Sequence, residues 1–376
     1  MNNPFVFGQV VSGEFFCDRE EERRVLSRDL KDSQKLFLIS PRRYGKTSLL
    51  KTVLKSLENE GFITVYIDLY RASSLQSFLE LYCASIASAS ETILDKAVSF
   101  IKDVVPRLRP KITLSPDGTP SIGIEPIISE RDVIGALDEV FDIPAHVAKR
   151  KNKKMAIVLD EFQEMANFNG EGLEKMLRSH VQNHDKVAYV FSGSKKHLLE
   201  DMVTKKERAF YKVGKIMYLG KIDRKIFSTF LSDKFISGNF EIEGDVIEKV
   251  LNVSDNIPYN VQFICHELWD EFVEVRKLTI RDVGWVLAKI VDEQTPFFIP
   301  QWDALSMNQR SLMKTVSNYG GKNLFTNEFL NISGIKAIST LQTSLRLLLK
   351  KGLLEKQNGD YVVADVFMKE WIRRNV

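Results

Sequence analysis

The most informative stretch of the chain is Ser40-Pro41-Arg42-Arg43-Tyr44-Gly45-Lys46-Thr47-Ser48, which directly follows the apolar run Leu36–Ile39. Its spacing fits the phosphate-binding loop G-x-x-x-x-G-K-[ST], with Ser40 where the first Gly is expected. The loop lies between a predicted strand and a predicted helix, and a helix N-terminus favours anions through its unpaired N–H groups and its dipole. The stretch therefore predicts a nucleoside triphosphate site.

Each residue of this loop from Pro41 to Ser48 is predicted to contact the nucleotide. In phosphate-binding loops the backbone N–H groups cradle phosphates, the Lys reaches the β and γ phosphates, and the hydroxyl holds Mg²⁺. These roles fall on Lys46 and Thr47. For Arg42 and Arg43 two interpretations stay open: contact with phosphate or a neighbouring molecule, or simple solvent exposure.

A second motif lies downstream, where Lys154-Met155-Ala156-Ile157-Val158-Leu159-Asp160-Glu161 reads as a buried strand ending in two carboxylates. In P-loop NTPases the Asp at the end of this strand helps to hold the metal, which assigns Asp160. Because strand side chains alternate, we expect Glu161 to point elsewhere and to act as the base for the attacking water. The alternatives are a loop carboxylate for Asp160 and a helix cap for Glu161.

A third candidate is Ser194, in the run Tyr189–Ser194 at the end of the next predicted strand. A polar side chain there would contact the γ-phosphate or the water. Ser and Gly at a strand end are also ordinary turn residues, so both interpretations stay open.

Short apolar strands alternate with helices through the first part of the chain, which predicts an α/β fold with a mostly parallel sheet. Strands are expected at 36–39, 62–69, 155–159, 187–192 and 215–219, and a hairpin around Pro116-Asp117-Gly118 at 111–124. Asp18 and Glu21 have the spacing of a capping box at the start of a helix.

Beyond residue 220 the pattern becomes helical, with segments predicted at 223–237, 243–253, 258–276 and 280–294. Pro296 and Pro300 are expected to form a short linker. Helices at 303–318, 325–331 and 336–350 then precede a hairpin at 353–364 around Asn358-Gly359, which is the order of a winged helix-turn-helix. The predicted domains are a P-loop NTPase core at 1–220, an all-helical lid at 221–297 and a winged helix at 298–376.

Three elements together resemble one family. They are Phe16-Cys17-Asp18-Arg19-Glu20, like an F-x-x-R-E element; the run from Pro41 to Leu49, like P-R-x-x-G-K-T-S-L; and the run from Val158 to Glu164, like a D-E-F-Q element. The chain in this respect resembles the archaeal-type ATPases of the AAA+ and STAND branch of P-loop proteins, relatives of origin-recognition ATPases. Phe210-Tyr211 and Asn256-Ile257-Pro258-Tyr259 extend the resemblance.

The resemblance implies ATP rather than another nucleotide, with Arg19 and Pro258 near its base. Two positions depart from the family pattern. Asn256 stands where Gly is often found, and Lys212 follows Phe210-Tyr211 where an Arg is often nearby. Both departures concern how the γ-phosphate is sensed, and hence the rate of hydrolysis.

The basic excess of the chain lies in its tail. Residues 301–376 hold 11 Lys+Arg against 6 Asp+Glu, whereas the rest holds 42 against 44. This asymmetry indicates either a polyanionic partner or a solvated surface. In a recognition helix at 336–350, exposed positions and the wing would offer contacts to duplex DNA through residues 336–356, namely Lys336, Ser339, Thr340, Gln342, Thr343, Arg346, Lys350, Lys351 and Lys356. Leu341, Leu345, Leu348 and Leu349 form the predicted core stripe, and the module would equally suit a protein partner or self-assembly.

The cysteine and histidine spacings predict no disulfide framework and no metal site. Cys17, Cys83 and Cys265 are far apart, which excludes a disulfide framework and favours a reducing cytoplasm. His180 and His184 lie four apart without the Glu of H-E-x-x-H, so a solvated or capping role is predicted for them. With no signal segment and no long apolar run, we expect a protein that is neither secreted nor membrane-bound.

Two hypotheses follow for the function. The first is a Mg²⁺-dependent ATPase, a hydrolase with Walker A and Walker B motifs that converts ATP and water to ADP and phosphate, with Lys46 and Glu161 as catalytic groups. The alternative is a slow-turnover nucleotide switch, or a DNA-binding regulator that carries ATP as a ligand without significant hydrolysis.

Overall fold

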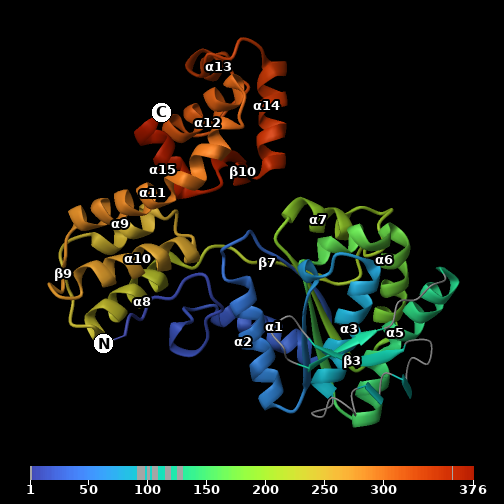
Figure 1. Cartoon of the computed structure of the whole chain (residues 1–376). Coiled ribbons are helices and arrows are strands. Elements are labelled where there is room, and N and C mark those ends of the chain that lie inside the picture. The colour runs from blue at the N-terminus through green and yellow to red at the C-terminus, as the bar shows by residue number, and fades with distance from the viewer. Residues whose placement is uncertain are drawn as a thin grey trace. The chain divides into compact units, whose positions relative to one another are not determined.

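The computed structural model describes residues 2–90, 98–99, 102–103, 109–114, 120–124, 130–357 and 359–376. The chain forms two compact units. The core unit is Val10–Lys221, and the helical unit joins the segment up to Gln9 to Ile222–Val376. Each is described by itself below (Figure 1).

The core unit alternates strands and helices. Its elements are η1 (Gly13–Phe15), α1 (Glu20–Lys31), β1 (Lys35–Ile39), α2 (Lys46–Asn59), β2 (Ile63–Asp68), η2 (Leu69–Arg71), α3 (Leu75–Ser90), β3 (Pro110–Leu114), β4 (Pro120–Ile124), α5 (Glu130–Lys151), β5 (Met155–Asp160), η3 (Phe162–Met165), α6 (Ala166–Asn183), β6 (Val187–Gly193), α7 (Lys196–Thr204) and β7 (Lys215–Tyr218).

Five strands form one sheet in the order β2-β5-β6-β1-β7, and all neighbours in it are parallel. The predicted mostly parallel sheet is confirmed. The chain leaves β1 for β2, which is separated from β1 by β6 and β5 on one side, and reaches β7 on the other side only after β6. The carboxyl end of β1 therefore lies where the strand order reverses, which is where open α/β sheets bind ligands.

Helices cover both faces of this sheet because its strands are apolar on both faces. On one face Leu36, Leu38 and Val158 pack with residues of α1 and α2 such as Leu26 and Leu50. The opposite face, which includes Phe37, Ile157 and Phe191, packs with residues of α3, α5 and α6. Figure 1 shows α3 and α5 together beside the sheet. The sheet is thereby enclosed as the middle layer of a sandwich.

Two local predictions had different outcomes. The hairpin at 111–124 is confirmed as an antiparallel pair of β3 and β4, while its predicted turn at Pro116-Asp117-Gly118 lies outside the described residues. The capping box of Asp18 and Glu21 is wrong. Helix α1 begins at Glu20 after Arg19, whose φ of 68° is left-handed, and no side chain caps it. The acidic residues of its first turn interact with the helix dipole instead.

The helical unit contains the remaining elements. They are α8 (Arg224–Ser237), β8 (Glu241–Ile242), α9 (Val246–Val253), α10 (Pro258–Phe272), β9 (Lys277–Leu278), α11 (Ile280–Asp303), α12 (Met307–Tyr319), α13 (Asn327–Ser333), α14 (Ile338–Lys351), β10 (Leu354–Gln357), β11 (Asp360–Val363) and α15 (Val366–Asn375). A short parallel pair of β8 and β9 accompanies the predicted helices.

The predicted linker at Pro296 and Pro300 is wrong, because both prolines lie inside the continuous helix α11. A proline inside a helix costs about 3 kcal/mol, so packing must offset it. The ring centroid of Trp371 on α15 lies 6.1 Å from that of Phe298 and 5.9 Å from that of Trp302. These aromatic contacts hold the second half of α11 helical.

The tail has the predicted order of helices α12, α13 and α14 followed by a hairpin. Strands β10 and β11 pair antiparallel with Gln357 opposite Asp360, which confirms the hairpin, although Asn358 lies outside the described residues. The sequence did not indicate α15, which packs on α11 and α12. The predicted core stripe of α14 holds for Leu341, Leu345 and Leu348, whereas Leu349 is exposed.

Candidate nucleotide-binding site

The predicted phosphate loop connects the carboxyl end of β1 to the first turn of α2. Gly45 precedes the helix with a φ of 82°, and Arg43 has a φ of 71°. No side chain caps α2, so the backbone N–H groups of its first turn are open to a ligand. A helix N-terminus at the switch point of a parallel sheet is suited to bind phosphate.

Lys46 and the two carboxylates after β5 meet at this edge. The Lys46 Nζ contacts Asp160 Oδ1 and lies 3.0 Å from Glu161 Oε1. Lys46 is 7% exposed and Asp160 is 3% exposed. Burying a charge costs free energy unless the charge is paired. Lys46 therefore compensates the negative charge of the buried Asp160 carboxylate.

Asp160 is the most heavily contacted group of the site. Its carboxylate accepts hydrogen bonds from Tyr66 Oη, from Ser192 Oγ at 2.7 Å and from the Glu161 N–H at 2.9 Å; Thr47 Oγ1 lies 3.4 Å from Oδ2. Burial alone would raise the pKa of Asp160, but Lys46 and the hydrogen bonds outweigh it and lower the pKa below its usual value. Asp160 is therefore ionised at neutral pH.

Glu161 is oriented differently from the sequence expectation. The alternation argument fails because Glu161 lies beyond the strand with a left-handed φ of 52°. Its Oε2 accepts from Gln163 Nε2 at 2.6 Å and from Ser194 Oγ at 2.8 Å. Burial opposes ionisation, but Lys46 and these donors lower the pKa of Glu161. Both carboxylates consequently converge on Lys46.

Sequence reasoning missed Tyr66, Gln163 and Ser192 as members of the site. Ser192 and Ser194 flank Gly193, and a Cβ on Gly193 would lie 2.1 Å from Gln163 Oε1. The glycine thus permits the close approach that places the Gln163 amide on Glu161. The signal that could have identified Ser192 is its place as a polar residue at the carboxyl end of β6, the strand between β1 and β5. Tyr66 lies on β2, on the other side of β5.

Asp68 adds a third carboxylate to this edge, because it pairs in register with Asp160 on the neighbouring strand. Burial and the negative charges of Asp160 and Glu161 raise the pKa of Asp68, despite its hydrogen bond from the Tyr70 N–H. The carboxyl ends of β2 and β5 together form an acidic edge opposite Lys46.

Arg19 lies beneath the phosphate loop rather than in solvent. It is 4% exposed, and its guanidinium donates to Gly220 O at 2.7 Å, to Tyr44 O at 3.3 Å and to Lys221 O at 3.4 Å. It also forms an ion pair with Glu22 at 2.9 Å. Arg19 therefore ties the loop to the segment that follows β7.

The other predicted residues are distributed as follows. In the loop Arg42, Arg43 and Gly45 are exposed, Pro41 and Thr47 are half-buried, and Tyr44 and Ser48 are buried. Pro258 begins α10 in the helical unit. Asn256, where the family resemblance led us to expect Gly, has a φ of 53°, a conformation that Asn tolerates best after Gly.

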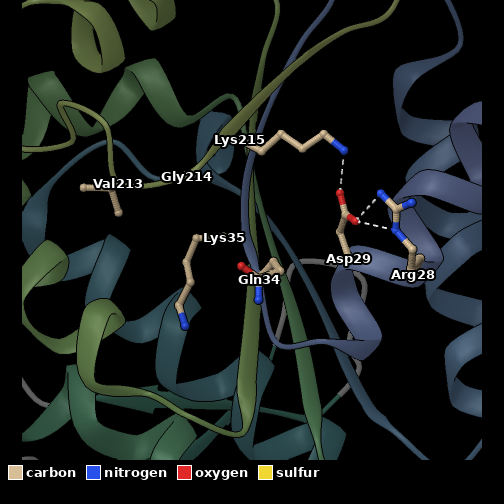
Figure 2. Close-up of a pocket in the computed structure, with 7 residues that line it drawn as sticks. All are labelled: Arg28, Asp29, Gln34, Lys35, Val213, Gly214 and Lys215. Atoms are coloured by element: carbon tan, nitrogen blue, oxygen red, sulfur yellow. Dashed lines mark hydrogen bonds and ion pairs between the residues drawn. The ribbon is translucent and has the colours of Figure 1, made fainter.

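A pocket of about 290 Å³ lies at the opposite end of the sheet. It is lined by Arg28, Asp29, Gln34, Lys35, Val213, Gly214 and Lys215, at the start of β1 and β7. Figure 2 shows Lys215 and Arg28 both reaching the Asp29 carboxylate, at 2.7 Å and 2.8 Å. Arg28 and Lys215 are both paired with Asp29, and the pocket lies at the amino end of the strands instead of at their carboxyl ends, so it does not match the phosphate loop as an anion site.

The prediction of a solvated or capping role for the histidines holds in part. His184 is the C-cap residue of α6, but it is buried instead of solvated, and it lies with His180 and Asp142 in a cluster whose ligand atoms are within 4.8 Å of one another. The partner carboxylate comes from α5, which spacing within α6 does not reveal.

Comparison with known proteins identifies the family. Residues 16–263, more than half of the chain, match the family described as an ATPase domain predominantly from Archaea. The chain belongs to this P-loop ATPase family. Residues 297–374 match a probable winged helix domain. The expected recognition and fold class are thereby confirmed, and membership of an ATPase family supports nucleotide binding by the chain.

Solved structures with the same fold have low sequence identity. The Walker-type ATPase PABY2304 of Pyrococcus abyssi has a TM-score of 0.63 at 19% identity, covering 96% of this chain and 97% of that one. The Aeropyrum pernix ORC2 protein in ADPNP-ADP complexes has a TM-score of 0.57 at 14% identity, with 98% of each chain covered. The Aeropyrum pernix ORC1 protein in complex with DNA has 0.51 at 12%, with 96% and 94% covered.

No curated protein matches the sequence. Within the part of the chain that the structure describes, no helix combines the length and the apolarity needed to cross a bilayer.

Proposed function

We propose that this P-loop ATPase is a Mg²⁺-dependent enzyme of the AAA+/STAND type, whose nucleotide state controls the binding of DNA or a protein partner. The observation that carries the proposal is the convergence of Lys46, Asp160 and Glu161 at the switch point of the sheet. Family membership and the phosphate loop support ATP as the nucleotide. Buried free cysteines among the described residues fit the expected reducing cytoplasm.

In the proposed reaction Lys46 and the N–H groups at the start of α2 bind the phosphates and neutralise the charge that develops during transfer. Glu161 accepts a proton from water as the water oxygen bonds to the γ-phosphorus. The bond to the bridging oxygen breaks, and ADP and phosphate leave. Ser194 and Gln163 hold the Glu161 carboxylate in place through their hydrogen bonds.

The donors at this edge fit Mg²⁺, which prefers oxygen ligands and keeps several waters. Thr47 Oγ1 and the Asp160 carboxylate would hold it, and they already lie 3.4 Å apart. Bound there, the ion would supply charge neutralisation between the β and γ phosphates. Asp160 is ionised, as a metal ligand must be.

Nucleotide binding would change the partners of Lys46. Phosphates would replace Asp160 and Glu161 as the partners of Lys46, and the released carboxylates would become available to the metal and to water. A slow-turnover switch is the second candidate, because Glu161 is engaged by Lys46, Gln163 and Ser194 together.

Two contacts connect the phosphate loop to the points where the chain leaves the core unit. The Val11 N–H donates to Ser48 Oγ at 3.1 Å, close to the crossing after Gln9. Arg19 joins Tyr44 O to Gly220 O and Lys221 O, at the crossing before Ile222. We infer that these contacts transmit nucleotide occupancy to both connections. For Arg19 we propose this role in addition to its predicted position near the nucleotide base. The position of Pro258 near that base stays a prediction.

The winged helix presents the residues expected for contact with duplex DNA. On α14 and its flanks Lys336, Gln342, Arg346 and Lys350 are exposed, as are Ser339 and Thr343, while Thr340 is half-buried. Lys351 donates to Ala304 O at 3.2 Å, and the Lys356 ammonium lies 5.6 Å from the centroid of the Tyr361 ring. We propose that the freely exposed face of α14 contacts duplex DNA; a protein partner is the alternative.

The direct test of the proposed function is ATP hydrolysis by the full chain with and without duplex DNA, at saturating Mg²⁺. An ATPase coupled to DNA should turn over and be stimulated by the duplex. Turnover that is unaffected by DNA would refute the coupling to DNA and would leave the ATPase activity and a protein partner. Tight ATP binding without hydrolysis under either condition would refute the enzyme and favour the switch.

For the winged helix we expect duplex affinity to fall with salt, with a log–log slope of about −0.9 per phosphate neutralised. Replacing Arg346 and Lys350 by Ala should reduce the slope by about one for each lost phosphate contact. Fluorescence anisotropy at several salt concentrations measures both. The control is Lys249→Ala, an exposed lysine on α9. Absence of duplex affinity at low salt would contradict the proposal and favour a protein partner.

A further inference from the structure

Two helices of the core unit place four metal-binding side chains against one another, at a distance from the phosphate loop. Asp138 and Asp142 are four residues apart on α5, and His180 and His184 are four apart at the end of α6. Residues spaced by four lie on the same helical face, so each helix presents two ligand-type side chains. The two faces meet because α5 and α6 pack together on the same face of the sheet.

Both histidines of this cluster face the Asp142 carboxylate, and His180 also contacts Asp138. His180 Nδ1 lies 2.6 Å from Asp142 Oδ1, and His180 Nε2 lies 2.8 Å from Asp138 Oδ1. His184 Nε2 lies 3.4 Å from the same Asp142 Oδ1. Single ligand atoms of Asp142, His180 and His184 all fall within 4.8 Å of one another, which is compatible with a common ion after small side-chain rotations.

A group behind the cluster fixes the orientation of His184. Its Nδ1 lies 2.8 Å from the hydroxyl of Tyr189, on the strand β6. With Nδ1 engaged by this hydroxyl, Nε2 faces Asp142. Metal-bound histidines characteristically have the second ring nitrogen held by a hydrogen bond, which sets the tautomer and the ring orientation.

The exposure of the side chains also fits a ligand set. The His184 side chain is only 2% exposed. Asp138 and Asp142 are 70% and 46% exposed, so an ion can reach the cluster from solvent.

We propose that Asp142, His180 and His184 form a binding site for a divalent transition-metal ion of the Zn²⁺ class, with Asp138 holding the second ring nitrogen of His180. Two imidazoles and carboxylate oxygens suit Zn²⁺ and its neighbours, whereas the oxygen donors at the phosphate loop suit Mg²⁺. The site would join α5 to α6. It lies by the amino end of β6, where Lys35 Nζ also donates to His184 O at 3.1 Å, and the nucleotide site is at the carboxyl end.

The test uses the full chain after treatment with a chelator, titrated with Zn²⁺ by calorimetry and with Co²⁺ by absorbance. We expect one ion per chain, visible d–d bands for Co²⁺, and a melting temperature that rises with Zn²⁺ concentration. His180→Gln and His184→Gln should each weaken Zn²⁺ binding by at least about 10-fold. Even residues that only hold a metal ligand in place change the metal affinity by about 10-fold to 100-fold. His197→Gln, an exposed histidine on α7, should leave it unchanged.

If His184→Gln fails to fold, Asp138→Asn and His180→Gln at the more exposed positions still test the site. The proposal is overturned if the wild type shows neither Co²⁺ bands nor a thermal shift at a large excess of metal, or if His197→Gln weakens binding as much as His180→Gln. Nucleotide binding is not involved in any of these readouts, so the result is independent of the proposed ATPase function.

Discussion

Replacing Glu161 by Gln is expected to lower ATP turnover by about 10²-fold to 10⁴-fold, the usual contribution of a general base. Gln keeps the shape of the side chain and its ability to accept from Lys46, but it cannot take a proton from water. The phosphates are bound by the loop, so ATP affinity should change little. Single-turnover hydrolysis and nucleotide binding, measured on the same preparation, separate the two effects.

Glu164→Gln is the matched control for this variant. Glu164 lies in η3, the short helix for which Glu161 is the N-cap residue, and its carboxylate pairs with Lys195 at 3.0 Å instead of Lys46. It should hydrolyse ATP like the wild type. Unchanged turnover in Glu161→Gln would show that Glu161 is not the base, and the slow-turnover switch would then explain the site better.

Replacing Lys46 by Ala should abolish measurable nucleotide binding, because the variant loses the cation that reaches the β and γ phosphates. A fall in affinity of at least about 10²-fold corresponds to about 2.7 kcal/mol. Binding of a fluorescent ATP analogue measures it. The matched control is Lys55→Ala on the same helix, whose exposed ammonium pairs with Glu58 at 2.9 Å. Retention of wild-type affinity in Lys46→Ala would exclude the loop as the phosphate site.

The same variant should also destabilise the nucleotide-free protein. Removing one partner of a buried ion pair costs about 3–5 kcal/mol, and the hydrogen bonds that Asp160 keeps favour the lower end of this range. The effect has a pH signature. Because the pKa of Asp160 is lower in the folded than in the unfolded state, the pair stabilises above about pH 4 and its contribution is lost as the pH falls. Denaturant unfolding at several pH values should show Lys46→Ala approaching the wild type in acid.

The residues of the nucleotide site differ in how far sequence could predict them. Lys46, Thr47 and Asp160 stand at fixed distances from a strand or a helix, so the local pattern was sufficient to place them at one edge. Ser194 was ambiguous between a site and a turn, and the structure places its hydroxyl 2.8 Å from Glu161 Oε2. Its predicted contact with the γ-phosphate stays a prediction.

Other features of the structure depend on backbone conformation and on contacts between residues far apart in the sequence. The orientation of Glu161 follows from a left-handed φ that strand alternation does not describe. Helix α11 continues through Pro296 and Pro300 because Trp371, about 70 residues further along the chain, packs against it. Such contacts add free energy that local propensity does not contain.

The sequence by itself determined the α/β class, the parallel sheet, the winged helix and the position of the candidate phosphate loop, because each depends on short-range periodicity or on fixed spacing. Only the tertiary structure decided which charged side chains lie close enough to interact. It brought Lys46 to Asp160 and Glu161 across 114 and 115 residues. It also placed His180 and His184 against Asp142 on another helix. Electrostatic energy depends on distance in space, and only packing fixes that distance.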